Sequence, residues 1–535
     1  MKSCKIFVFI LIASLLLIGC TTVEKHNCED FISDWIVEKD GLCGETIKRK
    51  KICTKCEKTL EKETVAKEHE MLEGIIQELT CTQDGIIQYT CALCGVVEDK
   101  TIPATGHNFI EEEVQELTCT QDGIIRTTCE YCGQSEVKRT KAEGHDYTET
   151  VLQELSCTKD GVIRYECNTC GQIKGETTPA TGHITGDANI LRAPSDTLLG
   201  HRTFSCANCN EDLGSQYYVD NGYFKNGKLK VVGPDLVNER GEKVQLFGLS
   251  THGLQWFGRY ANFNTIAAIQ EGFGNNIIRF AFYTDENGYC DGNEAKKKQM
   301  LADLMEGIDA ATKLGLYVIV DWHMVGAENV ADKNPLTYMA QSKEFFSFIS
   351  NHYKDQDNIL YEIMNEPNGS TTWADCKKYA ETIIPCIRKN TDAIVLVGNP
   401  KWTADLTSVM NDPLVGFKNI MYTYHFYAAD HTNTSQVVRA YDSGFPVFIS
   451  EFGFMLSSGD GDISESSGNN WKTVLDTRNI SYVAWNISNS KGSASIFKYN
   501  SGNMTSVEDS NLKVWGVYLK NWYREKSGLN NLSFE

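Results

Sequence analysis

Two glutamates, Glu366 and Glu451, each stand at the end of a predicted buried strand in the second half of the chain. Glu366 follows the largely apolar run at 359–364, and Pro367 after it cannot donate to a sheet ladder, so the strand must stop there. Desolvation in such a position favours the protonated form that a general acid needs. One carboxyl that protonates a leaving oxygen and a second that attacks the anomeric carbon or activates water are the minimum machinery of glycoside hydrolysis.

Polar and aromatic residues lie at or beyond the ends of most other predicted strands in this region. An arginine and a tyrosine close to the attacking carboxylate could hold it ionised by charge and hydrogen bonding. Tryptophan faces could stack on sugar rings, whose C–H faces are apolar. The residues concerned are His252, Trp256, Arg279, Tyr283, Asp321, His323, Asn365, His425, Tyr427 and Trp485.

Each of these residues also has a simpler interpretation. A glutamate at a strand end is more often solvated or salt-bridged than catalytic, and Arg279 could be the structural partner of an acid. His252, His323 and His425 could be buried core histidines, or together a metal site. Because polar groups recur at so many strand ends together with two tryptophans, the pattern as a whole favours a carbohydrate-active site.

The elements that must position these residues alternate between short apolar runs and helical patterns, which indicates an α/β fold. The predicted strands are 244–250, 276–283, 317–323, 359–365, 393–398, 420–427, 446–453 and 481–488. Helical periodicity marks 296–314, 338–353, 373–389 and 514–524. Eight strand–helix pairs predict a (β/α)₈ TIM barrel, with its site at the C-terminal ends of the strands. An open doubly wound sheet is the alternative, but no glycine-rich phosphate loop follows a strand.

The first half of the chain contains a 38-residue repeat that is rich in cysteine. ELTCTQDGIIQYTCALCG at 78 returns with changes as ELTCTQDGIIRTTCEYCG at 116 and as ELSCTKDGVIRYECNTCG at 154. Each repeat has Cys, nine residues, Cys-x-x-Cys, twelve residues and His, and a divergent copy precedes them. The four sets are Cys43, Cys53, Cys56 and His69; Cys81, Cys91, Cys94 and His107; Cys119, Cys129, Cys132 and His145; Cys157, Cys167, Cys170 and His183. A last fragment keeps only Cys206 and Cys209.

Three cysteines and one histidine in each repeat could close a tetrahedral Zn²⁺ site, and metal would then supply folding free energy to a ribbon with almost no core. The alternative is disulfide bonding, since the protein is predicted to be exported. It requires bridges between repeats or one free thiol in each. In neither case would the repeats be catalytic, because a closed Cys₃His site has no open position for a substrate. We expect them to act as a spacer or a binding arm.

The N-terminus resembles a bacterial lipoprotein signal. Lys2 and Lys5 precede an apolar run that ends Leu17-Ile18-Gly19-Cys20, so Cys20 would be lipidated and anchor the exported protein at the cell surface. An ordinary cleaved signal for secretion is the alternative. The predicted organisation is a signal at 1–20, a tether at 21–40, cysteine-rich repeats at 41–215 and the barrel at 216–535. Within the last part, 216–242 is predicted to form a hairpin or lid before the barrel.

The composition limits the partners. The chain has 535 residues, with 51 Lys+Arg against 71 Asp+Glu, so the formal net charge of −20 argues against nucleic acid. A neutral polysaccharide is compatible with this charge. We expect no metal or organic cofactor in catalysis, and a monomeric catalytic domain.

The segments THGLQWFG, RFAFYT, VIVDWH, LYEIMNEPNG, YHFYA, SEFG and VAWNIS together resemble glycoside hydrolase family 5, most closely its bacterial endo-β-1,4-glucanases. The resemblance covers about 228–524 and implies a retaining mechanism on β-glucan, with Glu366 as proton donor and Glu451 as nucleophile. It also implies supporting or substrate-binding roles for His252, Trp256, Phe257, Arg279, Tyr283, His323, Asn365, His425, Tyr427 and Trp485.

Two positions depart from the family's pattern. Phe452 follows the nucleophile where many of these cellulases have tryptophan, and the loop after the last strand offers Lys491 as a sugar contact. A mannanase, a xylanase or a mixed-linkage glucanase could use the same barrel. Two alternatives of another class are a surface glycan-binding protein that has lost activity and a zinc-binding scaffold that carries the barrel as cargo.

Overall fold

The structure is a computed structural model that describes residues 27–326, 333–499, 501 and 507–534. The predicted signal and Cys20 lie outside these residues, so the lipid anchor stays a prediction. The chain forms two compact units. The first comprises Met1–Glu154 with Asp160–Pro179, and the second comprises Leu155–Lys159 with Ala180–Glu535. None of the helices in the described part of the chain is long and apolar enough to cross a membrane.

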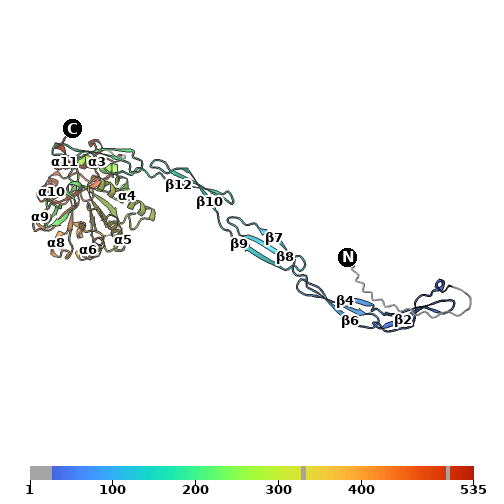
Figure 1. The fold of residues 1–535 in the computed structure, drawn as a ribbon. Helices are drawn as coiled ribbons and strands as arrows, with labels where there is room; N and C mark the ends of the chain where they lie inside the picture. The colour runs from blue at the N-terminus through green and yellow to red at the C-terminus, as the bar shows by residue number, and fades with distance from the viewer. Residues whose placement is uncertain (1–26, 327–332, 500, 502–506, 535) are drawn as a thin grey trace. The chain divides into compact units, whose positions relative to one another are not determined.

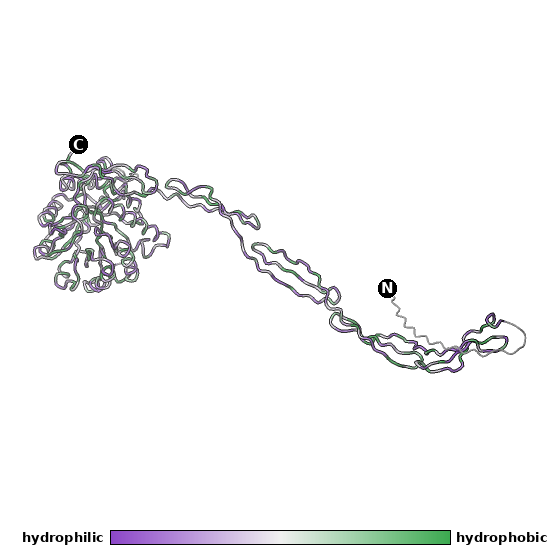
Figure 2. Tube along the Cα trace, in the orientation of Figure 1, coloured by the Kyte–Doolittle hydropathy of each residue, from purple (hydrophilic) through white to green (hydrophobic). Residues whose placement is uncertain are grey.

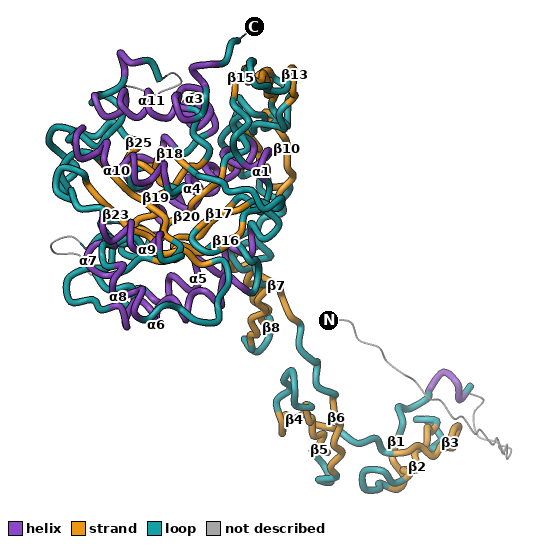
Figure 3. The backbone as a smooth tube through the Cα atoms, turned by 90° about the vertical axis from the view of Figure 1, so that its left-hand side faces the viewer, coloured by secondary structure: helices purple, strands orange, loops and turns teal. Residues whose placement is uncertain are grey.

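Eight parallel strands close a barrel in the second unit. Figure 1 labels the helices that surround it, and Figure 3 labels several of its strands. Neighbours in chain order pair along the ring, and pairing of β18 with β25 closes it. Their residues are buried, which explains the apolar runs in the sequence. The predicted (β/α)₈ barrel is confirmed. Its strands are β18 (Phe247–Thr251), β19 (Ile277–Tyr283), β20 (Tyr317–His323), β21 (Ile359–Glu362), β22 (Val395–Val397), β23 (Ile420–Tyr427), β24 (Val447–Gly453) and β25 (Tyr482–Ile487).

Helices follow the strands, and polar side chains fix where several of them begin. Asn262, Asn293 and Thr372 each accept a backbone N–H at the start of a helix, and Thr372 forms a capping box with Asp375. The longer helices are α3 (Phe263–Phe273), α4 (Glu294–Lys313), α5 (Met339–His352), α6 (Trp373–Arg388), α9 (Ser435–Asp442), α10 (Glu465–Thr477) and α11 (Val514–Lys526). Shorter helical segments are α2 (Leu254–Phe257), α7 (Pro400–Thr403), α8 (Leu406–Asn411), η2 (Gly258–Tyr260), η3 (Asp509–Asn511) and η4 (Leu529–Asn531).

A small hairpin closes the N-terminal end of the barrel. After α1 (Tyr223–Asn226), strands β16 (Lys230–Val232) and β17 (Asp235–Val237) pair antiparallel. Leu229 and Leu236 join one buried cluster with residues from the first halves of the barrel strands, among them Ile277, Tyr317, Leu360, Met421, Phe448 and Val483. The predicted hairpin or lid at 216–242 therefore includes a hairpin, and this hairpin plugs the end of the barrel opposite to the predicted site.

A three-stranded ribbon packs against the barrel within the second unit. It consists of β13 (Asn189–Arg192), β14 (Gly200–Ser205) and β15 (Asp212–Tyr218). Arg202 is completely buried, and its Nη2 donates to Gln216 at 2.6 Å and to Gln270 of α3 at 2.8 Å. Burial lowers the pKa of Arg202 to about 10. The predicted domain boundary at 215/216 is therefore wrong, because it would cut β15 and separate this buried bond network.

Four further ribbons have the same three-stranded antiparallel form. They are β1 (Ile36–Lys39), β2 (Thr46–Ile52) and β3 (Thr59–Ala66); β4 (Met71–Gln77), β5 (Gly85–Cys91) and β6 (Val97–Ile102); β7 (Phe109–Gln115), β8 (Gly123–Cys129) and β9 (Ser135–Thr140); β10 (Tyr147–Gln153), β11 (Gly161–Cys167) and β12 (Ile173–Thr178). Because η1 (Cys28–Phe31) and β1 are folded, the predicted tether at 21–40 does not extend through this stretch.

The ribbons bury almost no apolar side chain. Within the described residues before Leu199, every buried hydrophobic residue is a cysteine. Isoleucines and leucines such as Leu72, Ile75 and Ile110 are instead more than half exposed. In Figure 2 the traces of the ribbons show hydrophilic and hydrophobic residues interleaved along their length. Strands of this kind cannot obtain their stability from an apolar core.

Candidate active site

The C-terminal ends of the barrel strands surround a cavity of about 490 Å³ that contains both predicted catalytic glutamates. Glu451 lies in β24, and Glu366 lies just past β21, which ends at Glu362 rather than at the predicted 365. The chain after Glu362 nevertheless keeps to the barrel wall, since Glu366 N–H donates to Met324 O at 3.1 Å. The cavity is lined by Tyr283, His323, Val325, Glu366, Lys401, Trp402, Ala404, His425, Tyr427, His431, Glu451, Ser457, Ser458, Gly459 and Trp485.

Arg279 of β19 is the buried centre of the polar network. Its Nη1 donates to Glu451 Oε2 at 3.3 Å, and its Nε donates to Glu362 Oε2 at 2.7 Å. Its Nη2 donates to Asn365 Oδ1 at 2.6 Å and lies 3.0 Å from Asp321 Oδ2. Burial disfavours the charged guanidinium, but the three surrounding carboxylates outweigh this and raise the pKa of Arg279. Arg279 is therefore a permanent cation that bridges β20, β21 and β24.

Glu451 receives hydrogen bonds from two sides. Tyr427, the last residue of β23, donates its hydroxyl to Glu451 Oε1 at 2.8 Å, while Arg279 donates to Oε2. Burial and the charge of Glu451 raise the pKa of Tyr427 well above its ordinary value, so the hydroxyl keeps its proton. Two donors, one of them charged, therefore hold the Glu451 carboxyl in a fixed orientation.

Glu366 meets a different partner. His425 Nδ1 lies 2.9 Å from Glu366 Oε1, and His425 Nε2 lies 2.9 Å from Ser450 Oγ. Ser450 in turn donates its hydroxyl to Glu362. Burial lowers the pKa of His425, but bonds to Glu362 and Glu366 and the charge of Glu451 outweigh this and raise it to about 9.

The hydrogen bonds that run from Glu366 through His425 to Ser450 show how many protons Glu366 and His425 share. Because Ser450 uses its proton on Glu362, its oxygen must accept from His425 Nε2. His425 Nδ1 and Glu366 then have one proton between them. The pair therefore holds it either as imidazolium and carboxylate or as imidazole and carboxylic acid.

His323 is buried behind the cavity in a fixed orientation. Its Nδ1 lies 2.5 Å from Asp321 Oδ2, and its Nε2 lies 3.4 Å from the side-chain amide of Asn365. Burial and the nearby cation Arg279 lower the pKa of His323 to about 3, so the ring is neutral. Burial also raises the pKa of Asp321 well above its ordinary value, with Glu362 and Glu451 adding to the effect and Arg279 opposing it.

Aromatic rings line one side of the site. His323 stacks between Tyr283 and Trp485, with ring centroids 4.2 and 5.2 Å apart. His252 lies 5.1 Å from Trp485 and 5.0 Å from Phe257. Burial lowers the pKa of His252 to about 3. The structure thus places these histidines among aromatic rings and carboxylates.

Of the predicted substrate contacts, His252, Phe257, Trp256 and Lys491 do not line the cavity around the glutamates. Trp256 is 42% exposed and lines a neighbouring hollow with Gln255 and Lys296. Its ring lies 5.1 Å from that of Tyr283, so the hollow is close to the aromatic side of the site. Lys491 has its ammonium 5.5 Å from the ring centre of Tyr499 instead.

Sequence reasoning missed the loop after β22. Lys401, Trp402 and Thr403 all have positive φ, and Trp402 is 55% exposed at the cavity. Trp402 N–H donates to Pro367 O at 3.0 Å, and Thr403 Oγ1 donates to Asn365 O. This loop therefore supports the chain around Glu366. Its sequence, Asn-Pro-Lys-Trp directly after a predicted strand, carried the same signal as the other strand ends.

The predicted metal ligands come together, but the predicted grouping within single repeats is wrong. Each group joins the first cysteine and the histidine of one repeat with the Cys-x-x-Cys pair of the next. The four Cys₃His groups are Cys43, His69, Cys91 and Cys94; Cys81, His107, Cys129 and Cys132; Cys119, His145, Cys167 and Cys170; Cys157, His183, Cys206 and Cys209. Cys28, Cys53 and Cys56 form a further group of three. These groups could hold metal ions.

The geometry of a strand explains the error. Most of the nine residues between Cys81 and Cys91 belong to β5, which ends at Cys91. A strand rises about 3.3 Å per residue, so its two ends are about 20 Å apart. Cys81 and Cys91 therefore cannot ligate one ion whose bonds to sulfur are about 2.3 Å long.

The raised pKa of His425 predicts a pH-dependent contribution to stability. Its pKa of about 9 lies above the ordinary 6.5, so the contribution is complete below about pH 6.5 and is lost as the pH rises through 9. We expect the unfolding free energy of wild type minus that of His425→Gln to fall by about 3 kcal/mol between pH 6.5 and 9.5.

Denaturant unfolding across this pH range measures the difference, and His352→Gln, at an exposed position of α5, controls for loss of an imidazole. A difference that stays constant with pH would contradict the assignment of a charged His425.

Comparisons with known proteins agree with this site. The family model Cellulase (glycosyl hydrolase family 5) matches residues 237–491. Endoglucanase A of Butyrivibrio fibrisolvens is 39% identical over 316 residues, which are 58% of this chain and 70% of the relative. An endoglucanase of Clostridium saccharobutylicum is 34% identical over 61% of this chain and 68% of the relative. The catalytic domain of a Thermobifida fusca endoglucanase, solved in complex with cellotetraose, superposes with a TM-score of 0.52 at 32% identity, covering 56% of this chain and 99% of that domain. The chain therefore belongs to glycosyl hydrolase family 5.

Proposed function

We propose that the chain is a retaining endo-β-1,4-glucanase in which Glu366 is the acid/base and Glu451 the nucleophile. The observation that carries the proposal is the contrast between two carboxyl groups that line one cavity. Glu451 is held by two donors, Tyr427 and Arg279, whereas Glu366 shares a proton with His425. A pair of carboxyls in different environments supports separate acid and nucleophile roles.

In the first step Glu366, in its protonated form, gives its proton to the glycosidic oxygen as the bond to the leaving sugar breaks. Glu451 attacks the anomeric carbon from the other face and forms a covalent glycosyl-enzyme intermediate. In the second step Glu366 takes a proton from water, which attacks the same carbon and releases Glu451. The configuration of the sugar is therefore retained.

His425 would serve this cycle as a proton partner. Before the first step the proton shared with Glu366 can reside on the carboxyl, and after the proton has been donated the neutral imidazole leaves Glu366 able to act as a base. Tyr427 would hold the nucleophile before attack, when its full negative charge needs a donor.

The aromatic side supports a polysaccharide substrate. The cavity that contains both glutamates is also lined by Tyr283, Trp402 and Trp485. Exposed indole and phenol faces pack against the apolar faces of successive sugar rings. Relatives named endoglucanases and a solved relative that binds cellotetraose support a β-1,4-glucan rather than another polymer.

Substitution of the two glutamates tests the mechanism. Glu366→Gln should lower kcat on carboxymethyl cellulose by about 10²–10⁴-fold, because departure of the sugar loses its acid. On an aryl cellobioside with a dinitrophenolate leaving group the loss should be much smaller in the first step, since that group needs no proton. Glu451→Gln should be inactive on both substrates because it lacks the nucleophile.

Discontinuous assays with both substrates measure the activity of each variant. NMR identifies the anomer that the wild type releases first. Glu525→Gln, on an exposed carboxyl of α11, is the matched control. Near wild-type activity of either active-site variant on carboxymethyl cellulose, or release of the inverted anomer, would rule out the assigned roles.

The preferred polymer is tested with the full chain on carboxymethyl cellulose, mannan, xylan and barley β-glucan. Cleavage within chains predicts a fast fall in viscosity relative to the appearance of reducing ends, greatest on carboxymethyl cellulose. Activity on mannan or xylan alone would preserve the mechanism and replace the substrate. Binding without hydrolysis of any of the four would favour a glycan-binding protein.

For the N-terminal part we propose export and lipid anchoring through Cys20, on the sequence Leu17-Ile18-Gly19-Cys20 alone. Replacement Cys20→Ala should prevent the modification. Cell fractionation of a bacterial host should find the wild type with membranes and the variant not retained there by a lipid. Equal membrane association of both, or the absence of lipid from the wild type, would refute the anchor.

For the repeats we propose a structural role for zinc. Cys₃His is a donor set that Zn²⁺ uses in closed structural sites, and the ribbons lack an apolar core. The ion would take no part in the hydrolysis proposed for the barrel.

A further inference from the structure

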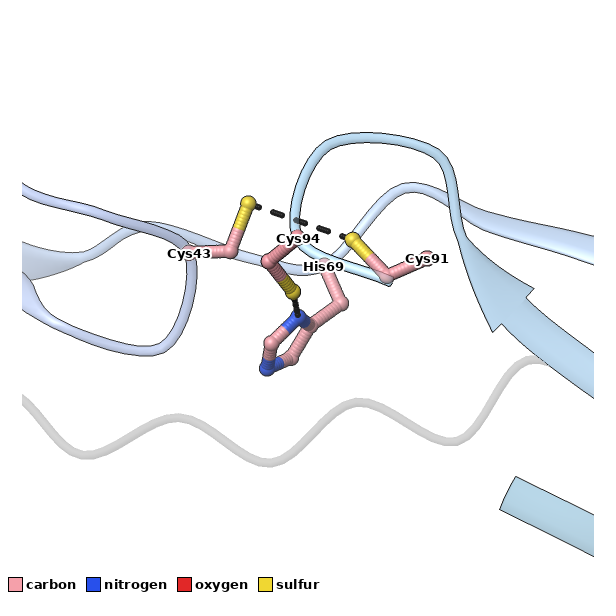
Figure 4. Close-up of side chains that lie close together, drawn as sticks. All are labelled: Cys43, His69, Cys91 and Cys94. Atoms are coloured by element: carbon pink, nitrogen blue, oxygen red, sulfur yellow. Dashed lines mark hydrogen bonds between the residues drawn. The ribbon is translucent and has the colours of Figure 1, made fainter. Parts of the chain in front are cut away.

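We propose that each zinc ion is shared by two successive repeats, so that metal coordination is the joint between one ribbon and the next. The inference rests on the structural zinc proposed above and goes beyond it. In the group of Figure 4, Cys43 and His69 come from one repeat and Cys91 and Cys94 from the following one. The same division recurs in each of the four Cys₃His groups.

The distances within the groups match a tetrahedral ion. The sulfur atoms of Cys81 and Cys129 are 3.6 Å apart, and those of Cys43 and Cys91 are 3.9 Å apart. Bonds of about 2.3 Å from Zn²⁺ to sulfur place two tetrahedral sulfurs about 3.8 Å from each other. The histidine takes the fourth corner, with His107 Nδ1 3.4 Å from the sulfur of Cys132.

The backbone around each Cys-x-x-Cys pair repeats one conformation. The residue after the second cysteine has positive φ in all five ribbons: Glu57, Gly95, Gly133, Gly171 and Asn210. Its N–H donates to the carbonyl of the first cysteine over 2.8–2.9 Å in every case. This tight turn brings both sulfurs to the same side. Glu57 and Asn210 adopt this positive-φ conformation although they are not glycine. We attribute the conformation to the requirement that both sulfurs bind the same ion.

Backbone bonds hold the two halves of a group in register. The residue after the first cysteine of the pair donates to the carbonyl of the residue after the histidine, as Ala92 does to Glu70 at 2.8 Å and Glu130 does to Asn108 at 2.9 Å. The other end of the ribbon carries the first cysteine of its own repeat. Each ribbon therefore offers two half-sites, one at each end, and neither is complete alone.

The fourth group shows where the series stops. Cys157 and His183 meet Cys206 and Cys209, and all four residues belong to the second unit. Cys206 directly follows β14 of the ribbon whose Arg202 is buried against the barrel. The catalytic unit thus supplies the last Cys-x-x-Cys half-site from a ribbon that is already fixed by packing.

Metal explains these groups better than disulfides do. A disulfide uses two sulfurs, so it would leave the other cysteine and the histidine of every group without a reason to lie there. All four donor atoms of each group instead lie within 4.8 Å of one another. The isoleucines and leucines of the ribbons are exposed, so they supply no buried apolar contact that could stabilise the junctions in place of metal.

Paired substitutions in the full chain separate sharing between repeats from binding within one repeat. Cys81→Ala/Cys129→Ala removes two ligands of one group that belong to different repeats. Cys81→Ala/Cys91→Ala removes two ligands of one repeat that belong to different groups. Each protein is first dialysed against a chelator strong enough to remove zinc from the affected group in each single variant. Metal analysis then gives the zinc content. The visible absorption of the Co²⁺-substituted protein reports tetrahedral thiolate coordination.

The shared arrangement predicts the loss of one zinc ion from the first double variant and of two from the second. The reverse pattern would overturn the sharing while leaving structural zinc in place. A wild-type chain without zinc, with a peptide map that links Cys81 to Cys129 by a disulfide, would overturn both. Hydrolysis of carboxymethyl cellulose by every variant confirms that the barrel has remained folded.

Discussion

The buried guanidinium of Arg279 is the interaction on which the arrangement of the site depends. It bonds Glu362, Asn365 and Glu451 and pairs with Asp321, so acidic groups from three strands share one cation. Without that cation these carboxylates would repel one another in a medium that screens charge poorly. Arg279 is itself tolerated in the core only because it is fully surrounded by acceptors. Glu366 is not one of these partners of Arg279. It pairs with His425 instead, and the two side chains can exchange a proton.

The barrel was predictable because its strands are buried on both sides and therefore read as apolar runs. Strands β20 and β23 match the predicted ranges, and most of the others differ by one to three residues at an end. The residues just beyond Glu362 were predicted as strand because they are apolar. Ile363 and Met364 are indeed buried, but they lie past the end of β21. Glu362 is the one charged residue in the run at 359–364, and the cation that satisfies it lies 83 residues earlier in the sequence. Long-range charge pairing of this kind leaves no local pattern.

The repeats show a limit of a different sort. Composition and spacing identified the candidate ligands of the first three Cys₃His groups and Cys157 and His183 of the fourth, but Cys206 and Cys209 were read only as an incomplete fragment. Period alone cannot say which copy supplies which ligand. The extended strand between the first two cysteines contained the missing information. Gly85 starts β5, and the connection before it spans the seven residues 78–84. If the nine residues between the first two cysteines of a repeat had been predicted as a strand, these cysteines would have been placed at opposite ends of it and assigned to different groups.

The sharing of ligands between neighbours has an evolutionary consequence. Excising or duplicating one 38-residue period joins a half-site to an equivalent half-site, wherever within the period the cut falls. The number of ribbons can therefore change by unequal recombination without leaving any cysteine pair unmatched. The barrel limits this process at one end only, because the last Cys-x-x-Cys pair belongs to its own packed ribbon. The number of ribbons that precede the barrel in the chain is thus a quantity that selection can change in whole periods while the active site stays unchanged.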